Sequence, residues 1–163
     1  MKRWERRVLG ILALGGSFLG LVLGVTLLAS QRSVLVAVFE LPFLVLYAWG
    51  IWCGLRMLEQ SEGALKMNAW FWAAQVPYIM SPLAGYYFAS GSMLYVTYQP
   101  NTSSLGMLAR FGSQFQYSLF QADKPVVLGV NILALVIVGW LVWRLYQSAP
   151  NNSIQRTQTR YAG

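Results

Sequence analysis

Long apolar runs dominate the chain. Four of them, at about residues 8–29, 34–55, 69–90 and 126–146, are each about 20 residues long. At 1.5 Å of rise per residue, a helix of that length crosses a hydrocarbon core of about 30 Å. The pattern therefore predicts an all-α membrane protein, an antiparallel bundle of four transmembrane helices.

The segment between the third and fourth runs, residues 91–125, has a different pattern. Residues 93–99 are rich in β-forming side chains, and residues 111–119 alternate apolar and polar positions with period two. We expect a small extracytoplasmic β-hairpin that rests on the bundle, because an isolated two-stranded hairpin is marginal in water. Residues 147–163 lack apolar side chains for burial, so we expect a disordered cytoplasmic tail.

Basic residues predict the orientation. With both termini in the cytoplasm, nine of the twelve Lys and Arg residues lie inside, which is the positive-inside pattern. We therefore expect a multi-pass protein integral to the membrane, placed in the bacterial inner (plasma) membrane. The alternative, residues 1–30 as a cleaved signal peptide, is weaker because this apolar run is about twice as long as a usual signal core.

Composition excludes several kinds of chemistry. The chain is 56% hydrophobic and 10% charged, it has no His, and Cys53 is its only cysteine. These counts exclude sites and nucleophiles that need His, and an intramolecular disulfide. The net charge of +7 does not indicate nucleic acid, because the basic residues cluster at membrane edges. We expect no enzyme, no metal and no cofactor, since no metal set, nucleophile–base pair or phosphate loop is present.

Small residues recur at helical spacing in the first two runs. Glycines four residues apart form a flat strip on a helix, which lets another backbone approach closely. We expect contacts within the chain, with subunit contacts or a pore lining as the alternatives. The glycines are Gly16, Gly20, Gly24, Gly50 and Gly54.

Three prolines interrupt the runs. Proline removes a backbone donor and kinks a helix, so we expect kinks at Pro42, Pro77 and Pro82. The two in the third run have an alternative interpretation, a broken helix at a binding site.

Glu40 is the only acidic residue inside the four runs. A carboxylate in hydrocarbon is costly, so an ionisable group there indicates a site. Counting residues from the span ends places Thr26, Tyr86, Tyr87 and Asn131 at the same depth, where they could be its hydrogen-bonding partners. A proton or cation site and a neutral carboxyl that fixes helix register both remain open.

Two functions fit these observations. The first is a non-enzymatic accessory or interaction subunit of a membrane assembly, whose partners are the lipid bilayer and other membrane subunits or a second copy. The alternative is a small ion or solute transporter or channel that uses Glu40, as a homo-oligomer. The first is favoured because four short helices enclose little room and no inverted repeat is apparent.

Overall fold

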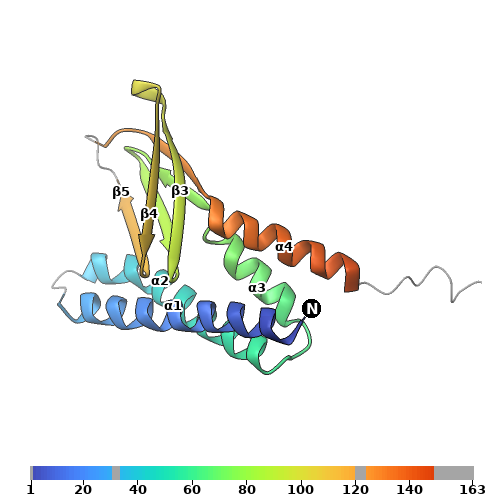
Figure 1. Cartoon of the computed structure of the whole chain (residues 1–163). Coiled ribbons are helices and arrows are strands. Elements are labelled where there is room, and N and C mark those ends of the chain that lie inside the picture. Colours follow the sequence, from blue (N-terminus) through green and yellow to red (C-terminus); the bar gives the residue numbers. More distant parts are fainter. Residues whose placement is uncertain (1, 31–33, 120–123, 149–163) are drawn as a thin grey trace, which may run out of the picture.

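A hairpin of two long helices forms the base of the molecule. The computed structural model describes residues 2–30, 34–119 and 124–148. Helices α1 (Arg3–Ser30) and α2 (Val34–Leu58) run antiparallel along each other (Figure 1). Among the described residues, these two helices are long and apolar enough to cross a membrane.

Two shorter helices pack beside one end of this hairpin. Helix α3 (Ala64–Ala73) begins after Gly63, and α4 (Ile132–Ser148) lies against α3 (Figure 1). The side-chain amide of Asn68 donates to the backbone oxygen of Cys53 at 2.9 Å, which ties α3 to α2. The four helices therefore meet over only part of the hairpin.

Six strands between α3 and α4 form one antiparallel sheet beside the rest of the hairpin. Its strand order is β4-β3-β6-β1-β2-β5. The strands rise away from the hairpin (Figure 1). The bounds are β1 (Pro77–Met80), β2 (Ala84–Ala89), β3 (Ser92–Gln99), β4 (Ser104–Phe111), β5 (Gln114–Leu119) and β6 (Val127–Asn131), with a short 3-10 helix, η1 (Pro100–Thr102), between β3 and β4.

The sheet curls at the end that meets the hairpin. Strands β2 and β3 are three positions apart in the strand order, a separation of about 14 Å in a flat sheet. The rings of Tyr87 on β2 and Tyr95 on β3 nevertheless lie 5.9 Å apart. Two turns meet at this end of the sheet, one between β2 and β3 and one between β4 and β5. A hydrogen bond joins them, in which the N–H of Gly112 donates to the backbone oxygen of Gly91 at 2.6 Å. Gly91 has a φ of +90°, which favours glycine in this tight turn.

This architecture shows that the predicted four-helix bundle is wrong. The third apolar run, 69–90, contains the second half of α3 together with β1 and β2, and the fourth, 126–146, contains β6 and most of α4. Pro77 begins β1 and Pro82 follows it in the turn, so neither kinks a helix, whereas Pro42 does lie inside α2. The reason is that these short strands carry apolar residues at successive positions, although Ile79, Leu128 and Val130 are exposed. Length and hydropathy do not distinguish such a continuous apolar run from a helix.

The expected small hairpin is part of this larger sheet. The strand predicted at residues 93–99 is present as β3, and the chain turns through η1. Its partner is β4, however, and β5, which carries the alternating pattern at 111–119, pairs with β2. The predicted tail lies mostly outside the described residues.

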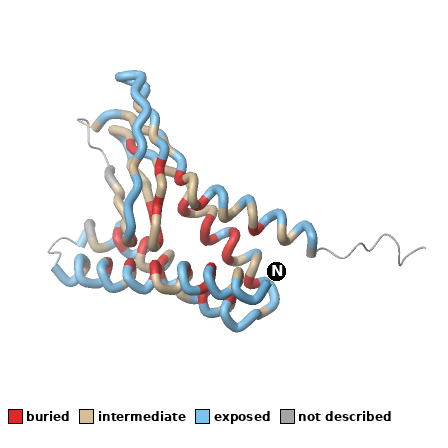
Figure 2. The backbone as a smooth tube through the Cα atoms, in the orientation of Figure 1, coloured by how far each residue is buried: buried red, intermediate tan, exposed pale blue. Residues whose placement is uncertain are grey.

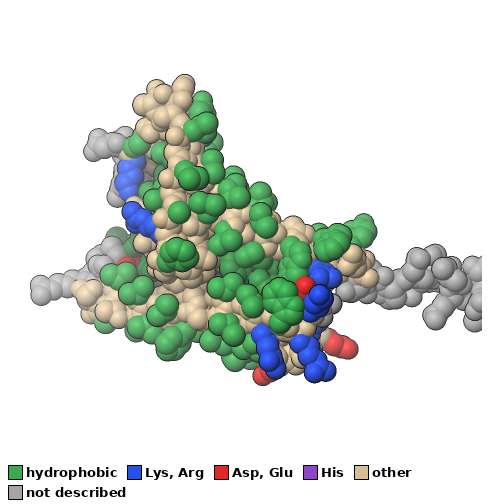
Figure 3. Space-filling view, in the orientation of Figure 1, with side chains coloured by type: hydrophobic (Ala, Val, Ile, Leu, Met, Phe, Trp, Pro, Cys, Tyr) green, Lys and Arg blue, Asp and Glu red, His purple; other side chains and the backbone are tan. Residues whose placement is uncertain are grey.

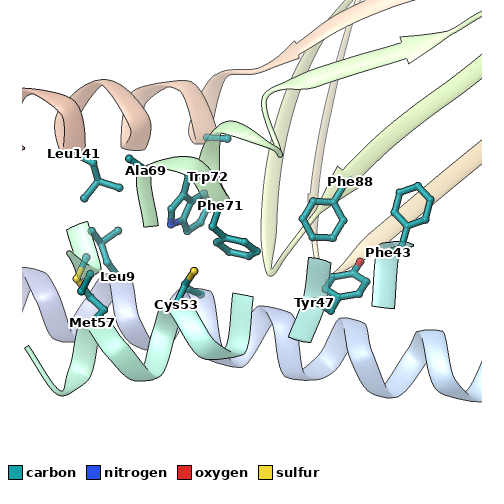
Figure 4. Close-up of a cluster of buried hydrophobic side chains, with 13 residues drawn as sticks. Leu9, Phe43, Tyr47, Cys53, Met57, Ala69, Phe71, Trp72, Phe88 and Leu141 are labelled. Carbon is teal, nitrogen blue, oxygen red and sulfur yellow. The ribbon is translucent and has the colours of Figure 1, made fainter. Parts of the chain in front are cut away.

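An aromatic core joins the helices to the sheet. Figure 4 shows Phe71 and Trp72 of α3 above the hairpin, and Phe88 of β2 beside Tyr47 of α2, with ring centres 4.8 Å apart. The Tyr47 hydroxyl donates to the backbone oxygen of Ala89 at 3.2 Å. The sheet is thus anchored on the middle of α2.

The five glycines predicted to form close contacts, all in the hairpin, lie where another element approaches closely. A Cβ on Gly16 would lie 2.6 Å from the backbone nitrogen of Gly91, and one on Gly54 would lie 2.7 Å from Cβ of Leu14. Such distances leave no room for a side chain. The same holds for Gly20 against the Tyr47 ring, Gly24 against Leu44, and Gly50 against Ser17 and Phe71.

Candidate functional site

Glu40 lies on α2 where β5 packs against the hairpin. It is 4% exposed, and its Oε2 atom has no hydrogen-bond partner among the described residues. The ring of Tyr117 lies 5.8 Å from that of Phe39 and 6.1 Å from that of Phe43, on the two sides of Glu40 in the sequence. Burial, and after it the nearby Glu40 charge, raises the pKa of Tyr117. Tyr117 was not among the predicted partners of Glu40.

Asn131 has a structural position between β6 and α4. It is fully buried, and its Oδ1 accepts from the backbone N–H of Leu94 at 3.2 Å and of Ala134 at 3.3 Å. A side-chain oxygen that accepts from the third helical residue is an N-cap. Asn131 therefore joins β3, β6 and α4.

The two tyrosines of the predicted site face opposite sides of β2. The Tyr86 hydroxyl donates to the backbone oxygen of Ala74 at 2.8 Å, and its ring stacks on Phe43 at 5.9 Å. The Tyr87 hydroxyl donates to Oε1 of Gln114 at 3.0 Å. Successive residues of a strand point to opposite faces, so only Tyr86 shares the surroundings of Phe43.

The predicted constellation is therefore dispersed. Thr26 is exposed, and its hydroxyl donates to the backbone oxygen of Val22 within the same helix at 2.8 Å. Within the part of the chain that the structure describes, no hydrogen bond joins any two of the five candidates: Glu40, Asn131, Tyr86, Tyr87 and Thr26. The prediction placed the five residues together because it assumed four straight helices that carry them at equal depth. In the structure, Tyr86, Tyr87 and Asn131 belong to the sheet instead.

A pocket that sequence reasoning missed lies at the junction of hairpin and sheet. Its volume is about 360 Å³, within the usual range for ligand pockets. One wall is apolar and comes from α1, α2 and Phe115, whereas the other is polar and comes from the sheet. The lining residues are Gly20, Leu23, Leu27, Tyr47, Tyr87, Arg110, Ser113, Gln114 and Phe115.

The polar wall of this junction pocket is held by hydrogen bonds. The hydroxyl of Ser113 accepts from the backbone N–H of Gly91 at 3.1 Å and donates to the backbone oxygen of Gly16. Burial and the neighbouring Tyr78 raise the pKa of Tyr87, and the positive charge of Arg110 opposes them. Arg110 makes no ion pair with a carboxylate in residues 2–30, 34–119 and 124–148. The junction pocket thus combines a cation, fixed polar groups and an apolar wall.

Basic residues gather at the other end of the hairpin (Figure 3), where α1 and α4 meet. Arg144 of α4 pairs with Glu5 of α1 at 3.0 Å and lies over the rings of Trp140 and Trp143, 5.4 and 5.2 Å from their centres. Arg and Trp together are typical of the membrane–water interface. The cations of this basic end are Lys2, Arg3, Arg6, Arg7, Arg56, Lys66 and Arg144.

Metal-binding side chains are sparse. Among the described residues, no three His, Cys, Asp or Glu side chains gather as a metal site would require. Cys53 is a free, buried cysteine. No protein-family model matches the chain, and neither a curated protein nor a solved structure shows significant similarity to it.

Proposed function

We propose that this chain is a membrane-anchored, non-enzymatic interaction subunit of a larger membrane assembly. The hairpin α1–α2 is its anchor, and strand β4 is the surface that pairs with a partner protein. The exposed apolar edge of β4 is the observation that carries the proposal.

The exposed surface of the hairpin supports the role of an anchor. Figure 2 shows its outer side exposed, and Figure 3 shows hydrophobic side chains along it. Helices satisfy their own backbone hydrogen bonds, so such a surface can face lipid. Exposed apolar residues on α1 and α2 include Ile11, Phe18, Val22, Val25, Leu35, Val38, Leu41 and Val45.

Strand β4 is an unprotected sheet edge. Among the described residues it pairs only with β3, and three apolar side chains on one face are largely exposed: Leu105 at 77%, Met107 at 76% and Phe111 at 94%. Exposed edges in monomeric proteins are usually blunted by charge, proline or bulges. A partner strand can pair with such an edge by main-chain hydrogen bonds and take up alternate side chains.

Copurification in mild detergent tests this proposal. We expect the full chain to retain a stoichiometric larger partner, and the double variant Leu105→Lys/Met107→Lys to lose it. Leu83→Lys is the matched control, because Leu83 is 71% exposed in the turn between β1 and β2. A partner that the double variant retains would contradict the role of β4, and a symmetric ring of this chain alone would favour a pore.

Labelling tests the orientation. We propose that both termini are cytoplasmic, from the basic residues at one end of the hairpin. After replacement of Cys53, a cysteine at Ser30, the exposed last residue of α1 at the end opposite the basic residues, should react with an impermeant maleimide added outside the cell. Reaction only from the cytoplasmic side would contradict this orientation.

A second candidate function is transport of a proton or cation through Glu40. The buried Oε2 without a hydrogen-bond partner among the described residues favours it. Glu40→Gln keeps the shape of the side chain but does not ionise, so it should fold normally and abolish transport measured in proteoliposomes. If Glu40 is structural, Gln should preserve both stability and function while Ala reduces stability. An unaltered phenotype in Glu40→Ala excludes both roles.

A further inference from the structure

We infer that the junction pocket binds one phospholipid, with the lipid phosphate on Arg110 and the start of an acyl chain along α1. This inference goes beyond the interaction role proposed above. Only the depth of the pocket in the bilayer rests on the membrane placement of the hairpin proposed above.

The polar wall fits a phosphate group. An Arg guanidinium binds phosphate oxygens by two parallel hydrogen bonds, and its charge makes these bonds strong. Gln114 uses Oε1 to accept from Tyr87, which leaves its side-chain N–H groups as further donors. The described residues supply no carboxylate that competes for Arg110.

The apolar wall fits a hydrocarbon chain rather than a free anion. Leu23 and Leu27 lie about one helical turn apart on α1 and line the pocket together with Phe115 of β5. They extend the pocket along the helix axis, as an acyl chain requires. A free phosphate ion gains nothing from this wall, because apolar surface favours apolar ligands.

The depth of the pocket agrees with a lipid in the leaflet opposite the basic end. From Arg7 to Leu23 the helix rises about 24 Å, and from Arg7 to Leu27 about 30 Å. With the basic end at one interface, Leu23 lies at acyl depth and Leu27 at the opposite boundary of the hydrocarbon core. Basic pockets between membrane elements are known to bind lipid head groups.

Native mass spectrometry of the full chain in detergent, titrated with phosphatidylglycerol, tests the inference. We expect one lipid bound per chain and an affinity about tenfold or more lower in Arg110→Gln, the effect of losing a hydrogen bond to a charged group. Lys124→Gln, which removes the same charge outside the pocket lining, should bind like the wild type.

A second pair of variants tests the acyl chain. Leu23→Trp should fill the pocket and lower the affinity at least as much, whereas Leu19→Trp should not; both leucines are about half exposed on α1, and only Leu23 lines the pocket. Wild-type affinity in Arg110→Gln or in Leu23→Trp would overturn the inference.

Inorganic phosphate is the other arm of the experiment. If phosphate competes with the lipid at millimolar concentration and binds Leu23→Trp as well as the wild type, the pocket is an anion site and the lipid inference is wrong. The result is independent of partner binding, because the copurification test changes Leu105 and Met107, which do not line this pocket.

Discussion

The hairpin and the sheet both expose large apolar side chains, but they differ in how their backbone is satisfied. In α1 and α2 the hydrogen bonds lie within each helix. In the sheet, β4 and β5 are edge strands, and the outer edge of each has no strand partner within residues 2–30, 34–119 and 124–148. An unsatisfied backbone group in hydrocarbon costs several kcal/mol. The hairpin can therefore be surrounded by lipid alone, whereas the sheet edges need water or protein.

The two regions also differ in what holds them together. The hairpin is held by close packing at its glycines. Because these residues have no side chain, they leave space for Tyr47, Ser17 and the turn at Gly91. The sheet depends on buried polar groups, such as Asn131 and the Tyr95 hydroxyl, which donates to the backbone oxygen of Phe88 at 3.0 Å. Variants of each kind should separate the two modes of stabilisation.

The largest effect is expected at the contact between α1 and the rest of the fold. Gly20→Leu should lower the free energy of unfolding by about 3 kcal/mol, because the new side chain collides with the buried Tyr47 ring. Gly15→Leu is the control, since a Cβ there meets nothing within 4 Å. Thermal unfolding in detergent measures both. Equal stability of the two variants would show that the strip does not need its small residues.

The joint between the sheet and α4 should be the next most sensitive position. Asn131→Ala removes the cap of α4 and the acceptor for Leu94, which should cost about 2 kcal/mol. Asn101→Ala, at an exposed position in η1, should cost nearly nothing. Chemical denaturation of the two variants side by side measures the difference in their free energies of unfolding. A loss of stability of the same size in Asn101→Ala would refute the role of Asn131 as the cap of α4.

Alkaline pH should weaken the interior of the sheet. Burial, and then the neighbouring Tyr87 and Tyr86, raises the pKa of Tyr95 above its ordinary value of about 10. The neutral hydroxyl is thus favoured in the folded state. The contribution of this hydroxyl to the free energy of unfolding is fully present below pH 10, and it is lost as the pH rises through the folded-state pKa of Tyr95.

Tyr95→Phe tests this pH dependence. It should cost about 1 kcal/mol at neutral pH, the usual worth of one hydrogen bond, and should flatten the loss of stability above pH 10. Tyr98→Phe, at an exposed position of the same strand, should keep the wild-type profile. The melting temperature of each variant, measured as a function of pH, tests this prediction. If Tyr95→Phe loses stability above pH 10 as steeply as the wild type, Tyr95 does not have the proposed role.

The smallest effect is expected at the basic end. Glu5→Gln breaks the ion pair with Arg144, which is partly exposed, and should cost about 0.5 kcal/mol at low salt and less at high salt. Glu62→Gln at an exposed position is the control. A salt-independent loss would show that the pair acts through packing and not through charge.

The sequence alone determined the features that depend on local composition. Two apolar runs, 8–29 and 34–55, lie within α1 and α2, and the β-rich stretch at 93–99 lies within β3. The glycine spacing marked positions where neighbouring elements do come close, as at Gly16 and Gly54. These signals are local because helix length, strand composition and small side chains are all read from consecutive residues.

Only the tertiary structure decided the rest. A strand with apolar residues at successive positions has no period-two signature, so the runs at 69–90 and 126–146 resembled helices. Strand pairing is non-local: β2 pairs with β5 and not with β3, and β6 is inserted between β3 and β1. The junction pocket depends on that pairing, because Arg110 reaches α1 only where the curled sheet brings β4 to the hairpin.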